Sequence, residues 1–96
     1  MSIKIRNIIF RIEIFKEGDT IVSLCPELNV SSFGDTIDDA KKSLSEAISL
    51  FLEECERMGT LVDILEECGF SHMGKDWITR KPIEMDEIKI GLTTNV

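Results

Sequence analysis

The segment from Ile37 to Gly59 constrains the fold of this chain most strongly, because its pattern is that of a long amphipathic helix. Thr36, followed by Asp39 three residues later, predicts an N-cap in a variant of the capping box, and Gly59 predicts the C-terminal stop. The apolar residues recur at spacings of three and four and share one stripe, which must be buried against another layer: Ile37, Ala40, Leu44, Ala47, Ile48, Phe51, Leu52 and Cys55.

Three carboxylates surround the start of this helix, and they raise the question of an active-site loop. Asp35, Asp38 and Asp39 lie where the helix dipole favours negative charge, and Gly34 and Asp35 form the preceding turn. Capping and the dipole account for these residue types, so the Gly-Asp-Thr turn is interpreted as the start of a helix.

Upstream of the helix the chain has the alternation of β-strands. The run IIFRIEIFK, residues 8 to 16, places isoleucine and phenylalanine on one face and charged residues on the other. EGD at residues 17 to 19 predicts a tight turn, and TIVSLC predicts the second strand of a hairpin. After Pro26, LNVSSF (residues 28 to 33) could return as a third strand.

Downstream of Gly59 we expect a second, shorter helix and one last strand. Thr60 is expected to cap the helix and Gly69 to close it, with Leu61, Ile64, Leu65 and Cys68 on its apolar side. SHMGKDWITRKP, residues 71 to 82, is typical of a loop or an edge segment. MDEIKIGL, residues 85 to 92, alternates Ile88, Ile90 and Leu92 inward with Glu87 and Lys89 outward, which predicts a strand.

These elements predict an α+β fold with the order β-β-β-α-α-β. The sheet is mainly antiparallel, and the helices pack on one of its faces. At 96 residues the chain is expected to form a single domain, residues 1 to 96.

The cysteines and the apolar runs bear on the cellular compartment. Three cysteines at spacings of 30 and 13 give neither a disulfide framework nor a zinc pattern, which favours buried, reduced thiols. No apolar run approaches the roughly 20 residues that cross a bilayer, and the first ten residues lack the features of a secretion signal. We therefore expect a cytoplasmic protein without membrane contact, cofactor or metal.

The net charge of -7 is concentrated in one part of the chain. Residues 35 to 68 carry ten acidic and three basic side chains, whereas the remaining acidic and basic residues balance. This acidic segment would repel a phosphate backbone and attract a basic protein. The charge distribution therefore favours a protein partner over a nucleic acid.

From about Phe10 to Phe70 the chain resembles the HicB family of antitoxins. The resemblance rests on three signals in order: Pro26-Glu27-Leu28 after a strand, Gly34-Asp35-Thr36 before the helix, and Glu46-Ala47-Ile48 within it. It implies a partial ribonuclease H-like fold without nuclease activity, and an inhibitor of a HicA-type toxin, a small basic protein that cleaves messenger RNA. Many members carry a C-terminal DNA-binding domain; nothing after Phe70 has that pattern, so no direct DNA binding is expected.

Two classes of enzyme fit the sequence poorly. A two-metal nuclease needs several carboxylates on adjacent strands and a helix, but Glu13 lies opposite the apolar face of its strand, and the helix glutamates lie away from the apolar stripe. The sequence also gives no support for a catalytic triad, because it has one histidine, His72, and no Gly-x-Ser-x-Gly turn. We expect no catalytic residues.

Leu50 indicates where a partner could bind. At 100° per residue it lies on the charged face of the long helix, beside Glu46, Glu53 and Arg57, and these four residues are the candidate partner-binding site. The alternative is that Leu50 packs beneath the second helix. The function predicted is an antitoxin that covers the active surface of a HicA-type toxin; the other candidate is a solitary, homo-oligomeric protein-binding adaptor.

Two further expectations concern self-association and RNA. A short sheet leaves a strand edge open, and the family resembled usually assembles, so we expect a homo-dimer or a higher homo-oligomer. Trp77, near Lys75, Arg80 and Lys81, could stack a nucleobase, but a tryptophan clamped on the edge of the core is the favoured interpretation.

Overall fold

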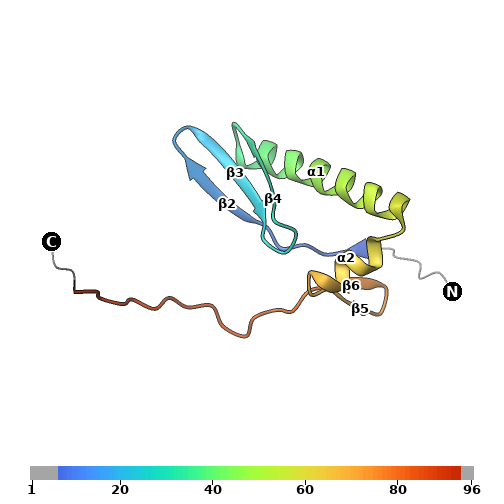
Figure 1. Cartoon of the computed structure of the whole chain (residues 1–96). Coiled ribbons are helices and arrows are strands. Elements are labelled where there is room, and N and C mark those ends of the chain that lie inside the picture. The colour runs from blue at the N-terminus through green and yellow to red at the C-terminus, as the bar shows by residue number, and fades with distance from the viewer. Residues whose placement is uncertain (1–6, 94–96) are drawn as a thin grey trace.

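The computed structural model describes residues 7 to 93 and has an α+β fold, as the sequence predicts (Figure 1). Two three-stranded sheets have the strand orders β2-β3-β4 and β1-β6-β5. The elements in chain order are β1 (Asn7–Ile8), β2 (Glu13–Glu17), β3 (Thr20–Cys25), β4 (Val30–Gly34), α1 (Ile37–Met58), α2 (Leu61–Glu67), β5 (Ser71–Met73) and β6 (Asp76–Ile78).

The first predicted strand, residues 8 to 16, is divided in the structure. Its beginning is β1, which pairs in parallel with β6, and its end is β2, which pairs antiparallel with β3. Residues 9 to 12 between them belong to neither strand. One extended stretch therefore contributes an edge strand to each of the two sheets and connects them.

The β2–β3–β4 sheet confirms the predicted hairpin and third strand. Gly18 adopts a left-handed conformation (φ 62°) in the tight turn between β2 and β3, which a glycine accommodates without strain. The antiparallel register aligns Phe15, Val22 and Phe33 across the three strands. β4 begins and ends slightly later than predicted, at Val30–Gly34.

Helix α1 confirms its predicted ends. The Thr36 hydroxyl accepts a hydrogen bond from the Asp39 amide at 3.0 Å, and Gly59 closes the helix in a left-handed conformation (φ 74°). Most of the predicted stripe is buried or half-buried, but Ile37, the first residue of the helix, is exposed. Thr60 caps no helix; its hydroxyl donates to the Cys55 carbonyl instead.

Three small residues allow α1 to lie close to the sheet at its N-terminal end. Gly34, at the end of β4, faces the backbone of Asp39 and Ala40 so closely that a Cβ atom would lie 2.6 Å from the Ala40 nitrogen. Ala40 is fully buried, and the buried Ser23 hydroxyl donates to the Ala40 carbonyl at 2.7 Å. The glycine of the Gly-Asp-Thr turn is therefore required by close packing.

The core consists of two small clusters along the length of α1. Cys25, Leu44 and Ile48 form the first, between α1 and the β2–β3–β4 sheet. The second lies beside α2 and the β5–β6 hairpin and contains Leu65, Phe70 and Trp77. Phe10 and Leu52 pack against both clusters and join them.

The C-terminal part differs from the sequence prediction in two ways. The predicted loop or edge segment at 71 to 82 contains the β5–β6 hairpin, and the predicted strand at 85 to 92 has no regular structure. The observed order is β-β-β-β-α-α-β-β. Ile88, Ile90 and Leu92, expected to face inward, are 75 to 87% exposed, because nothing in the described part of the chain lies beside this segment to pair with it.

Candidate functional site

The four predicted partner-binding residues lie on the solvent-facing side of α1. Glu46, Leu50, Glu53 and Arg57 follow one another at helical spacings of four, three and four, and all four are exposed. Leu50 is 67% exposed, so the alternative that α2 covers it is wrong. An exposed leucine surrounded by charged side chains is the arrangement found at small protein-contact patches.

Leu50 lies at a shallow, open hollow in this helix face. The hollow has a volume of about 360 Å³ and is lined by Leu50, Glu53, Glu54 and Arg57. Glu46 lies one turn before it and does not line it. We refer to these four lining residues as the α1 hollow.

Glu54 is the residue of the α1 hollow that the sequence analysis missed. It forms an ion pair with Arg57, at the i,i+3 spacing that places two side chains together on a helix. Both side chains are more than half exposed, and pairs of this kind contribute little to stability. Arg57 is therefore held beside carboxylates but still faces solvent, where it remains accessible to a partner.

The α1 hollow can bind but offers no evident catalytic chemistry. Its polar groups are two glutamates and one arginine, none of them within reach of a histidine or cysteine nucleophile in the hollow. Among residues 7 to 93, no group of three or more His, Cys, Asp or Glu side chains is placed to hold a metal ion. No helix in that range is long and apolar enough to span a membrane.

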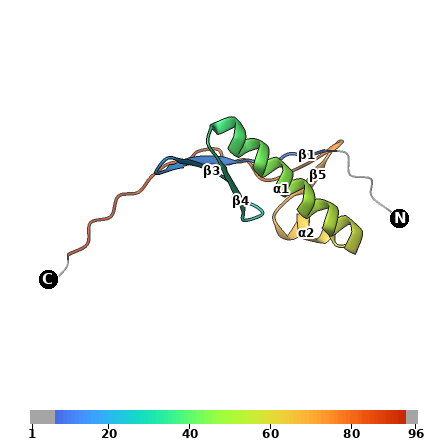
Figure 2. The same cartoon turned by 90° about the horizontal axis from the view of Figure 1, so that it is seen from above.

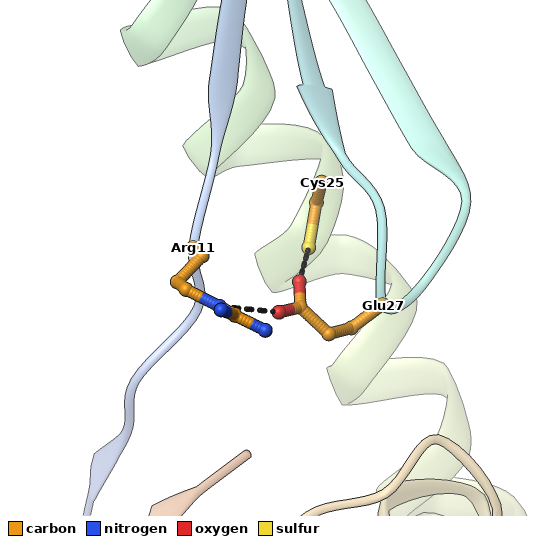
Figure 3. Close-up of polar contacts among 3 residues, drawn as sticks. All are labelled: Arg11, Cys25 and Glu27. Carbon is orange, nitrogen blue, oxygen red and sulfur yellow. Dashed lines mark hydrogen bonds and ion pairs between the residues drawn. The ribbon is translucent and has the colours of Figure 1, made fainter. Parts of the chain in front are cut away.

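A second polar cluster involves the Pro-Glu-Leu turn and was not predicted (Figure 3). Arg11 Nε donates to Glu27 Oε1 at 3.0 Å, and the Cys25 thiol points at Glu27 Oε2 at 3.7 Å. The Glu27 side chain is only 8% exposed. Glu27 thus connects the turn after β3 to the stretch between β1 and β2, a contact across 16 residues that no local pattern indicates.

The chemistry of Cys25 argues for a structural role in this cluster. Burial raises the pKa of the Cys25 thiol, and the neighbouring Glu27 carboxylate raises that pKa further. A reactive cysteine needs the opposite shift, because the thiolate is the nucleophile. Cys25 is fully buried and therefore acts as a core residue with a weak hydrogen bond to Glu27.

Trp77 is a core residue and cannot stack a nucleobase in this conformation. It is 3% exposed and packs in the second cluster with Leu65 and Phe70. The exposed His72 ring lies beside it, with ring centroids 5.5 Å apart. The Trp77 Nε1 atom is buried without a hydrogen-bond partner. The basic residues around Trp77 in the sequence therefore do not form an aromatic binding platform with it.

Comparisons with models of protein families, with curated proteins and with solved structures gave no match.

Proposed function

We propose that this protein is a HicB-like antitoxin, which binds a small basic HicA-type toxin and covers the surface with which the toxin cleaves messenger RNA. The three ordered motifs support this proposal, together with an element order in which strands precede a long capped helix. The observation that carries it is the α1 hollow, where an exposed leucine is bordered by carboxylates. Such an inhibitor would act in the cytoplasm, where its target is translated.

The charge of the helical segment gives this surface a preference for basic partners. Six of the acidic residues between 35 and 68 belong to α1 and a seventh, Asp35, to the turn before it, and all seven are exposed. Opposite charges increase the rate of encounter and disfavour wrong partners more than they increase final affinity. In this proposal the carboxylates orient the toxin, and Leu50 supplies the desolvated contact at the centre.

The first test is native mass spectrometry of the untagged protein purified from its own host. A small basic protein that co-elutes at fixed stoichiometry supports the antitoxin. If the chain appears only with itself across a range of salt concentrations, the proposal is overturned and the solitary adaptor becomes the better description.

The second test places the contact on α1. Leu50→Glu should weaken toxin binding by about 30-fold, the loss expected for a central interface residue. Glu53→Lys should slow association, with an effect that diminishes at high salt. Asp19→Lys in the β2–β3 turn makes the same charge change far from the α1 hollow and serves as the control. Binding that is equally affected by Asp19→Lys, or unaffected by Leu50→Glu, would remove the α1 hollow from the contact.

A further inference from the structure

In the C-terminal tail, residues 79 to 93, the segment from 85 to 92 has the alternation of a strand but pairs with no strand in the described part of the chain. After β6 the chain leaves the body and extends past the end of the β2–β3 hairpin (Figures 1 and 2), and Figure 1 shows most of it lying apart from the helices. Met85, Ile88, Ile90 and Leu92 along it are 75 to 87% exposed. Alternating apolar residues in extended backbone are typical of a half-buried strand, and here no neighbouring strand or layer in the described part of the chain buries them.

The same chain has a free sheet edge at β2. Within residues 7 to 93, β2 pairs with β3 on one side and with no strand on the other. Phe15 is 47% exposed and Ile12, just before β2, is 37% exposed, so apolar side chains border this edge on both faces of the sheet. A long edge with exposed apolar side chains is a template for a further strand.

Residues 7 to 93 place no helix on the opposite face of this sheet. α1 packs on the side of Ser23 and Cys25, whereas the row of Phe15, Val22 and Phe33 faces away from it. Phe33 is 69% exposed. The sheet therefore exposes apolar side chains on this face as well as the unpaired edge of β2.

The exposed area matches what an interface between two copies requires. The chain exposes 8045 Å², whereas a compact monomer of this size exposes about 5,600 Å². Its radius of gyration is 17.1 Å, against about 12.5 Å for a compact domain of this length. The difference in area is about 2,400 Å² per chain, or about 4,800 Å² for two chains, which lies near the upper end of the total area that obligate homodimers bury.

We propose that residues 85–92 form a β-strand on the free edge of β2 in a second copy of this chain, and that the second copy does the same in return. Eight extended residues span about 26 Å, which is more than enough to cover the five residues of β2, roughly 17 Å. Among the edge strands of the described residues, β2 is the one bordered by the exposed Phe15 and Ile12. If each chain supplies its tail to β2 of the other, a two-fold pair satisfies both contacts and closes. Ile88, Ile90 and Leu92 then lie together on one side of the added strand.

The direction of the tail favours pairing with β2 of a second copy over pairing with β2 of the same chain. A tail that continued the sheet of its own chain would follow β2 directly from β6. Instead it lies apart from the hairpin in the view of Figure 1 and extends beyond the end of the hairpin. This pairing is independent of the proposed toxin contact, because the α1 hollow lies on another element.

Sedimentation equilibrium on the full-length chain between about 1 and 100 µM, concentrations that bracket weak and tight dimers, tests this proposal. The wild type should be a dimer, and Ile90→Asp should raise its dissociation constant at least 100-fold, about 2.7 kcal/mol. Lys89→Asp introduces the same side chain on the opposite side of the tail and should remain dimeric. Leu50→Glu should also leave the mass unchanged, which separates this proposal from the toxin contact.

Hydrogen exchange on the wild type decides the result even if Ile90→Asp fails to fold. The amides of residues 86 to 92 and of β2 should be protected together in the dimer. A dimer whose tail exchanges freely would overturn the proposal, because another surface would then hold the pair. A monomeric wild type would overturn it as well, and a protected tail in that monomer would show that the segment folds onto its own sheet.

Discussion

The close approach between Gly34 and α1 predicts a large effect from a single added methyl group. In Gly34→Ala the new Cβ would lie 2.6 Å from the Ala40 nitrogen and 2.7 Å from the Asp39 Cβ. Ordinary contacts between such atoms are about 3.5 to 4.0 Å, so the strand and the helix must separate by about 1 Å. The obstructing atoms are mainly backbone, which cannot rotate away as a long side chain would.

This separation has two costs that can be estimated. Overpacking of a well-packed contact costs about 1 to 3 kcal/mol. Moving Ala40 away also lengthens the 2.7 Å hydrogen bond from Ser23, which contributes about 1 kcal/mol. We therefore expect Gly34→Ala to lower the free energy of unfolding by about 3 kcal/mol, or the melting temperature by about 12 to 24 °C.

Urea and thermal unfolding followed by circular dichroism at 222 nm measure the change. Gly74→Ala is the matched control, because Gly74 has a left-handed conformation (φ 63°) and open space around it. Its cost should be about 1 kcal/mol, from conformation alone. If Gly34→Ala destabilises the protein no more than Gly74→Ala does, the argument from close packing is wrong.

Two further predictions concern the cap of α1 and the buried thiols. Thr36→Ala removes the hydroxyl that accepts a hydrogen bond from the Asp39 amide and should lower the free energy of unfolding by about 1 kcal/mol. Thr60→Ala should cost less, because the Thr60 hydroxyl does not cap a helix. Equal losses of the two variants in urea titrations would contradict this prediction. Burial raises the pKa of Cys25 and Cys68 above 9.0, so the unfolded chain releases these protons first. The contribution of the two thiols to the free energy of unfolding should therefore be constant below about pH 9 and decrease above it. Cys25→Ala should make this decrease shallower. An unchanged slope of the free energy of unfolding between about pH 8 and 10.5 would show that Cys25 is not responsible for it.

The elements that the sequence predicts well are those whose signals are local. Thr36 and Gly59 define both ends of α1 because capping depends on residues within one turn. β3 matches its predicted run, Thr20 to Cys25, because a turn precedes it and a proline follows it. Leu50 was placed on the exposed face by helical geometry alone, and that is where the structure has it.

The features that the sequence could not predict depend on partners distant along the chain. Alternation in residues 85 to 92 indicates a segment able to form a strand, but not which strand lies next to it. The division of the first strand into β1 and β2 reflects pairing with β6, about 70 residues away. The contact of Arg11 with Glu27, and the burial of Trp77, likewise follow from tertiary packing.

Phe10 and Leu52, which pack against both core clusters, have a consequence for how the protein unfolds. Neither cluster has enough buried side chains to be stable by itself, and each shares two of its packing residues with the other. Loss of one cluster therefore removes support from the other, so the two should melt in a single cooperative transition. A fragment that contains only the β2–β3–β4 sheet and α1 would lack the second cluster, against which Phe10 and Leu52 also pack, and we expect it not to fold by itself.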